Sequence, residues 1–220
     1  MENGKTDIKL DLEPNSKPYL LKRLISDGFD TVSVFLLFML ISSLIFASPL
    51  AGVYNSHYEN YKKAEQSAVS EYGDDAAAIS EKLNNDAYYL EERFAANLHS
   101  YVLKAAAGFI AEAAVLLIVP LVDKKRCTPG KILTGIMPFS EKRQTKASRL
   151  TVLYRFIFIF IIDSAVLYLF TGILTFLLVP VIRLTEMLLN HKNKTICDAI
   201  TGVTIIEKRS YNGIDTEEKS

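Results

Sequence analysis

The chain has 220 residues, half of them hydrophobic, and 25 basic residues balance 25 acidic ones. Nucleic-acid binding needs an excess of basic residues, which this chain lacks, so we expect no nucleic-acid partner. The apolar residues are concentrated. Phe35–Ala51 contains no charge, and Ala105–Val122 and Phe156–Ile182 contain one each, Glu112 and Asp163. Runs this long and uniformly apolar are typical of membrane-spanning helices and argue against a soluble secreted protein.

The predicted fold class is therefore an all-α membrane protein, a bundle of four membrane-embedded helices. Residues 1–18 are polar and predicted to form a disordered tail. The first span covers about residues 20–51. Because a polar leader precedes it and it has full spanning length, we interpret it as an uncleaved anchor rather than a signal peptide.

Residues 52–104 form a polar excursion that we predict to be an extracellular helical hairpin. Asp74 and Asp75 follow Gly73 and indicate a turn that caps a second helix. Tyr54, Tyr58 and Tyr61 recur at helical spacing, which fits packing between the two arms or a ligand surface. An extracellular protein partner could bind this hairpin.

The second predicted span is 105–122, with Pro120 expected to kink its end. The loop 123–149 that follows carries eight basic residues against two acidic ones, Asp123 and Glu141. Loops rich in Lys and Arg stay in the cytoplasm. We therefore predict a cell-membrane, multi-pass protein with both termini in the cytoplasm.

The segment from Leu150 to Asn190 permits two interpretations. Its least polar part would form a helix of about 40 Å, longer than a hydrocarbon core of about 30 Å. Two spans, about 149–170 and 172–190, would fit if the chain turned at Thr171 and Gly172. One strongly tilted helix would instead leave three spans in total. Residues 208–220 are predicted to be a flexible cytoplasmic tail.

Charged residues inside apolar spans are costly and are candidates for function. Glu112 and Asp163 are predicted at similar depths, where two carboxylates could share a proton or bind a monovalent cation. Alternatively, hydrogen bonds from residues such as Ser164 or Tyr168 could neutralise each carboxyl group within the bundle.

A second layer of charge is predicted near the cytoplasmic surface. Arg23, Asp27 and Asp30 share one stripe of the first helix, and Arg23 could pair with Asp27. Asp30 needs a partner from elsewhere, and Arg155 and Arg183 are the candidates. This layer could serve ion or proton movement, or it could be an architectural ion-pair network.

Two short motifs lie in the second half of the chain. Thr128, Pro129, Gly130 and Lys131 have the wrong spacing for a phosphate-binding loop and predict a capped turn at the membrane surface. Thr195 and Asp198 have the form of a capping box, so Asp198 could be only a helix cap. Gly202 would end that helix, and a strand at 203–207 could pair with 135–139. No internal repeat is apparent.

No residue set predicts enzymatic catalysis, a cofactor or a metal site. His57 and His99 are predicted outside and His191 inside, so the three cannot form one site. Cys127 and Cys197 fit no metal or redox spacing and are predicted in the reducing cytoplasm.

These motifs together resemble the RDD family of membrane proteins over about residues 19–207. The Arg23–Asp30 spacing, the Thr128–Lys131 stretch and Asp198 followed by Ala199, Thr201 and Gly202 resemble the family's three segments. Thr201 and Val203 depart from its closing pattern, and the extracellular hairpin is larger than the family needs.

The resemblance implies possible transport, since some members resemble sodium/proton antiporters. Two hypotheses follow. The chain is a transporter or cation/proton exchanger that uses intramembrane carboxylates, and a bundle this thin is expected to form a homo-oligomer. Alternatively, it is a non-transporting scaffold or assembly partner that acts through its hairpin.

Overall fold

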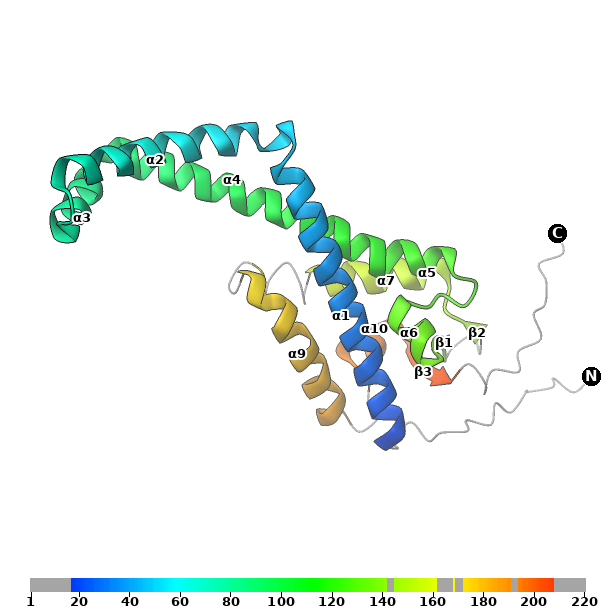
Figure 1. Ribbon diagram of the computed structural model, residues 1–220. Coiled ribbons are helices and arrows are strands. Elements are labelled where there is room, and N and C mark those ends of the chain that lie inside the picture. Colours follow the sequence, from blue (N-terminus) through cyan, green and yellow to red (C-terminus); the bar gives the residue numbers. More distant parts are fainter. Residues whose placement is uncertain (1–16, 142–144, 162–167, 169–171, 191–193, 208–220) are drawn as a thin grey trace, which may run out of the picture. The chain divides into compact units, whose positions relative to one another are not determined.

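The computed structural model describes residues 17–141, 145–161, 168, 172–190 and 194–207. The tails predicted at 1–18 and 208–220 therefore lie almost wholly outside the described residues. The chain forms two compact units (Figure 1). One comprises residues 1–36 and 111–220, and the other comprises residues 37–110. Helices dominate both units, which confirms the all-α class in outline.

Within the described ranges, two helical stretches are long and apolar enough to cross a membrane. The first is α1 (Lys17–Phe46), and the second joins α4 (Ala87–Glu112), the π-helical segment η2 (Ala113–Ile118) and α5 (Val119–Val122). Only 17% and 28% of their most apolar windows are buried within the protein. A soluble core helix would bury much more, so this exposure favours contact with lipid.

The third and fourth predicted spans are represented by two separate helices, α7 (Arg149–Phe158) and α9 (Thr175–Leu189), with the turn η4 (Gly172–Leu174) before α9. Most of residues 162–171 lie outside the described part of the chain. Asp163 is among them. Whether 149–190 crosses a membrane twice stays a prediction.

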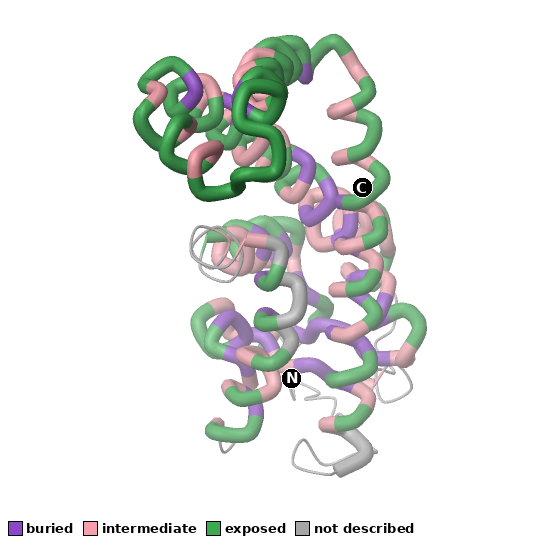
Figure 2. The backbone as a smooth tube through the Cα atoms, turned by 60° about the vertical axis from the view of Figure 1, so that its left-hand side comes forward, coloured by how far each residue is buried: buried purple, intermediate pink, exposed green. Residues whose placement is uncertain are grey.

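The second unit contains the predicted hairpin. After η1 (Pro49–Ala51), α2 (Gly52–Tyr72) leads through Gly73 to α3 (Ala76–Asn85). The Asp75 side chain accepts hydrogen bonds from the backbone N–H groups of Ala77 and Ala78, which confirms the predicted helix cap. Most of the hairpin's surface is exposed (Figure 2).

The tyrosine stripe contributes to packing between α2 and α4. The rings of Tyr61 and Tyr89 meet edge to face with centroids 6.3 Å apart, and the Tyr89 hydroxyl donates to Glu65 at 3.1 Å. Burial would raise the pKa of Glu65, but the Lys62 ammonium and the Tyr89 hydroxyl outweigh it and lower that pKa. The packing interpretation of the stripe is therefore the one these contacts support.

A three-stranded antiparallel sheet lies in the first unit, in the order β2 (Thr145–Lys146), β1 (Ile136–Ser140), β3 (Val203–Glu207). Ile136 pairs with Glu207 and Ser140 with Val203, so the predicted pairing is confirmed. Both faces of β1 are covered. Ile136 packs with Val203 and Ile205 on one face, and Met137 packs with Phe139, Ile206 and Cys127 on the other.

The sheet reveals an internal repeat that was not predicted from the sequence. Strand β1 follows the six-residue helix α6 (Pro129–Thr134), and β3 follows the six-residue helix α10 (Ile196–Thr201). Each helix follows a threonine N-cap, Thr128 or Thr195, and ends at a left-handed glycine, Gly135 (φ 72°) or Gly202 (φ 62°). The two antiparallel strands are thus related by an approximate two-fold axis through the Pro138–Ile205 pair.

Side-chain hydrogen bonds repeat with the backbone. The Thr134 hydroxyl donates to the Gly130 carbonyl, and the equivalent Thr201 hydroxyl donates to the Cys197 carbonyl. Upstream, Asp123 is the C-cap of α5 and Asn190 is the C-cap of α9. The Asp123 carboxylate accepts the Cys127 N–H, and the Asn190 amide donates to the Lys194 carbonyl. The repeat is therefore structural rather than a coincidence of one turn, although few residues are identical.

Helix α6 approaches α1 closely at Gly130. A Cβ atom at this position would overlap the carbonyl oxygen of Ser26 and crowd the Asp30 carboxylate. Only glycine permits this approach, because the atoms it would meet belong mainly to helix backbone, which cannot move aside cheaply.

We expect Gly130→Ala to destabilise the protein by about 1–3 kcal/mol, because the added methyl group forces α6 away from α1. Gly28→Ala is the matched control, since Gly28 lies in α1 with open space around its Cα. Its melting temperature in detergent should be unchanged or higher. Equal melting temperatures for Gly130→Ala and the wild type would contradict the close approach.

Candidate functional site

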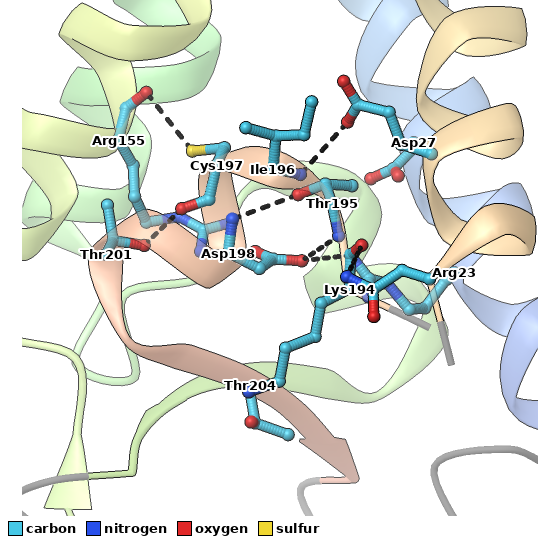
Figure 3. A network of polar contacts seen from close by, with 12 residues as sticks. Arg23, Asp27, Arg155, Lys194, Thr195, Ile196, Cys197, Asp198, Thr201 and Thr204 are labelled. Carbon is cyan, nitrogen blue, oxygen red and sulfur yellow. Dashed lines mark hydrogen bonds and ion pairs between the residues drawn. The ribbon is translucent and has the colours of Figure 1, made fainter. Parts of the chain in front are cut away.

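Asp198 lies at the centre of a buried cluster of charges (Figure 3). Arg23 of α1 donates to its Oδ2 at 2.6 Å, and Arg155 of α7 donates to its Oδ1 at 2.6 Å. The same carboxylate closes the capping box of α10, because its Oδ2 accepts the Thr195 N–H and its own N–H donates to Thr195 Oγ1. Asp198 is thus a helix cap and the link between three helices.

The two guanidinium groups keep Asp198 ionised. Burial by itself would raise the pKa of this carboxyl group, but Arg155 and Arg23 outweigh burial and hold the pKa well below its usual range. A buried carboxylate that accepts hydrogen bonds from two arginines and one backbone N–H has its main acceptor positions filled. This cluster therefore suits a structural role better than proton exchange.

Asp30 has a different set of partners from those predicted. Its Oδ2 accepts a hydrogen bond from the Thr128 hydroxyl at 2.5 Å, and its Oδ1 accepts the Gly130 N–H at 2.7 Å. The Lys131 ammonium lies 3.7 Å from Asp30 and 3.8 Å from Asp27. Asp30 therefore caps the N-terminus of α6 from the neighbouring helix, and the turn motif is its binding partner.

Of the two predicted partners of Asp30, Arg155 was the wrong choice, because its guanidinium is held by Asp198. Arg183 lies in the neighbourhood of Asp30, since both line one cavity. Arg23, which was predicted to pair with Asp27, binds Asp198, and Asp27 lies 3.8 Å from the Lys131 ammonium. Pro129 occupies the first position of α6, where its missing N–H costs nothing.

Glu112 lines a small cavity together with Asp30 and Arg183. The cavity has a volume of about 30 Å³, and Thr31, Thr175 and three apolar residues complete its wall. Glu112 is only 8% exposed. The π-helical segment η2 begins at the next residue, and π-helical turns within α-helices occur frequently at functional sites. Because Pro120 has no N–H to donate to Leu116, the regular α-helical pattern cannot continue unbroken here.

A second cavity of about 50 Å³ lies beside this charged layer. Asp30, Arg183 and Leu116 line both cavities. Asp30 and Arg183 therefore connect the charged residues of the second cavity with Glu112 in the first. The remaining charged residues that line the second cavity are Arg23, Asp27, Arg126, Lys131, Arg155 and Glu186.

Glu186, Thr175 and Arg126 are polar lining residues that were not predicted from the sequence. Glu186 follows Arg183 by one helical turn, and Thr175 is a polar residue within an apolar helix, so both carried a readable signal. Arg126 carried none. It is the one non-glycine residue with positive φ (61°) within the described ranges, a backbone conformation that sequence does not announce.

The family comparison covers nearly all of this architecture. A model of the RDD family matches residues 17–202. The chain belongs to the RDD family. No curated protein and no solved structure was found to be similar. The resemblance stated from the motifs is thereby confirmed.

The residues that carried the RDD resemblance come together in this chain's first unit. Arg23 and Asp198 bind each other directly, and Asp30 binds the Thr128–Gly130 turn. The motifs are far apart in the sequence, but they form two adjoining charge clusters along one face of α1. Glu112 joins Asp27, Asp30 and Glu186 among the carboxylates that line the two cavities.

Replacing Asp198 with Asn should destabilise the protein by about 3–5 kcal/mol, because two buried guanidinium groups lose their counter-charge. Asp74→Asn on the exposed hairpin is the control. Since the folded pKa of Asp198 is depressed, its contribution is fully present above the unfolded value of about 3.9 and is lost as the pH falls below it.

Thermal unfolding in detergent from pH 8 to pH 3 measures this effect. The difference between the wild type and Asp198→Asn should stay constant down to about pH 5 and narrow only below about pH 4. A difference that already disappears between pH 7 and 6 would show that another group is responsible.

Proposed function

We propose that this RDD-family chain is a multi-pass membrane protein that moves protons or monovalent cations by means of intramembrane carboxylates. The observation that carries the proposal is the cavity in which Glu112, from an apolar helix, meets Asp30 and Arg183. A carboxylate next to a guanidinium can exchange a proton or a small cation when the local balance of charge changes.

The two cavities suggest a route for the ion. From the charged layer an ion would pass Asp30 and Arg183 and reach Glu112, since these side chains line successive volumes. A cavity of about 30 Å³ has room for about one water molecule, which is enough for a proton relay. Asp163 remains a predicted second carboxylate at the depth of Glu112.

Because two long apolar helices cannot enclose a path alone, we propose a homo-oligomer as the working form.

Purified protein in liposomes that contain a pH-sensitive dye tests the proposal. Imposed gradients of Na⁺, Li⁺ or K⁺ should move protons in the wild type, and Glu112→Gln should abolish the response because the side chain can no longer lose a proton. Glu59→Gln on the exposed surface of α2 is the control. The double variant Glu112→Gln with Asp163→Asn tests the predicted pair.

The mechanism is wrong if none of the three cations moves protons in the wild type. It is equally wrong if Glu112→Gln transports at the wild-type rate while the Glu59→Gln control is also unaffected.

The proposed topology has both termini and the basic loop in the cytoplasm and the hairpin outside. Both native cysteines are buried, so single added thiols can report on accessibility. A membrane-impermeant maleimide should label Ser70→Cys in intact cells and Thr145→Cys only after lysis, because both positions are exposed on the protein itself. The reverse pattern would overturn the orientation.

The alternative function is that of a membrane scaffold that acts through the hairpin. Residues 37–110 form a compact unit of their own, and α4 exposes an apolar stripe of Leu90, Phe94, Leu98 and Val102 at four-residue spacing. Replacing residues 56–98 with a short linker should remove a co-purifying partner and leave ion movement unchanged. An unchanged set of partners would exclude the scaffold.

A further inference from the structure

The hairpin holds two histidines in an arrangement that the proposed ion movement does not use. His57 of α2 and His99 of α4 lie face to face, with ring centroids 5.4 Å apart and ring planes 23° from parallel. His57 is 29% exposed at its side chain, so the pair is accessible from solvent without being fully solvated. Two imidazoles this close together on separate helices can bind one ion if they turn so that the nitrogen lone pairs, which lie in the ring planes, point at a common position.

Hydrogen bonds at the Nδ1 atoms indicate which nitrogen of each ring carries the proton. His99 Nδ1 lies 2.8 Å from the Ala95 carbonyl oxygen, which can only accept, so this nitrogen carries the proton. His57 Nδ1 lies 2.7 Å from a Glu92 carboxylate oxygen, which also accepts when ionised. In the neutral form of either ring, the lone pair is therefore on Nε2, where it can bind a ligand.

These are the outer partners that metal-binding histidines ordinarily have. A ligating imidazole usually donates its other N–H to a carboxylate or a backbone carbonyl, which fixes the ring and makes the ligating nitrogen more basic. Here Glu92 supplies the carboxylate and Ala95 the carbonyl. Glu92 is itself held by the Asn60 amide, which donates to the same oxygen at 3.1 Å. The support for two ligands is therefore already assembled.

We propose that His57 and His99 bind a divalent transition-metal ion such as Zn²⁺ or Cu²⁺ on the hairpin, through their Nε2 atoms. Imidazole prefers these ions to Mg²⁺ and Ca²⁺, which prefer oxygen ligands. Because the ring planes are only 23° from parallel, both side chains must rotate before their Nε2 atoms converge on one ion at metal–nitrogen distances of about 2.0–2.1 Å.

The site is open and exchangeable. Among the described residues, no three or more His, Cys, Asp or Glu side chains are arranged to hold a metal ion, so water completes the coordination. The ion joins α2 to α4, and the excess of acidic residues in 52–104, nine against five basic, attracts it electrostatically.

Titration of the full-length detergent-solubilised protein, prepared without a histidine tag, tests the site. Isothermal titration calorimetry at pH 7.5 should detect one Zn²⁺ per chain and no heat of binding with Mg²⁺. His57→Gln and His99→Gln should each weaken binding at least about tenfold, and Glu92→Gln should weaken it by about 10–100-fold through loss of orientation.

His191→Gln is the matched control, since the chain has only three histidines. It should bind as the wild type does. The proposal is overturned if the wild type binds no Zn²⁺, if His191→Gln removes binding, or if either hairpin variant binds normally.

A measurement on the wild type avoids any dependence on how the variants fold. The electron paramagnetic resonance spectrum of bound Cu²⁺ should show coupling to two imidazole nitrogens. Coupling to one nitrogen or to none would exclude a site shared by the two rings. Lowering the pH should release the ion, because protons compete for the same Nε2 atoms.

Discussion

The first unit depends on one buried carboxylate, that of Asp198, and on the two arginines that share it. Burying three charged groups is unfavourable unless each finds its partners, and Asp198 supplies them for both guanidinium groups while closing the cap of α10. Because Arg23 comes from α1 and Arg155 from α7, the cluster fixes three helices that are distant in sequence. The sheet that follows α10 is positioned as a consequence.

The internal repeat explains why the charges of this layer fall into two groups. Lys131 and Asp198 occupy the same position in the two short helices, but their charges are opposite. Asp198 therefore binds arginines, whereas Lys131 lies between Asp27 and Asp30. In the second copy of the repeat, Asp198 and its two arginines form a closed cluster of ion pairs. The first copy binds Asp30, which lines a cavity together with Glu112, and we propose that the function lies there.

Much of this arrangement could be predicted from residues whose physical meaning is local. The apolar runs, the Asp75 cap, the capping box of Asp198 and the pairing of β1 with β3 all follow from short-range patterns. Charge partners could not be predicted, because they depend on which helix meets which. Asp30 was expected to bind an arginine and instead caps α6, an interaction possible only because Gly130 permits a close approach.

The internal repeat could not be recognised from the sequence for a related reason. Only the threonine caps, the threonine–glycine ends and the apolar strand residues are common to its copies, and the central residues differ. The histidine pair escaped because His57 and His99 belong to separate arms, and only the register of α2 against α4 brings their rings together. Both features are properties of packing between elements, and periodicity within one element does not reveal them.

The most direct test of this account is a double-mutant cycle between Arg23→Gln and Asp198→Asn, with thermal stability measured in the same detergent at pH 7. If the two side chains share one buried interaction, the double variant should be less destabilised than the sum of the single variants by about 1–3 kcal/mol. Additive losses would mean that Arg23 and Asp198 act independently, and the cluster could then not be what holds α1 to α10.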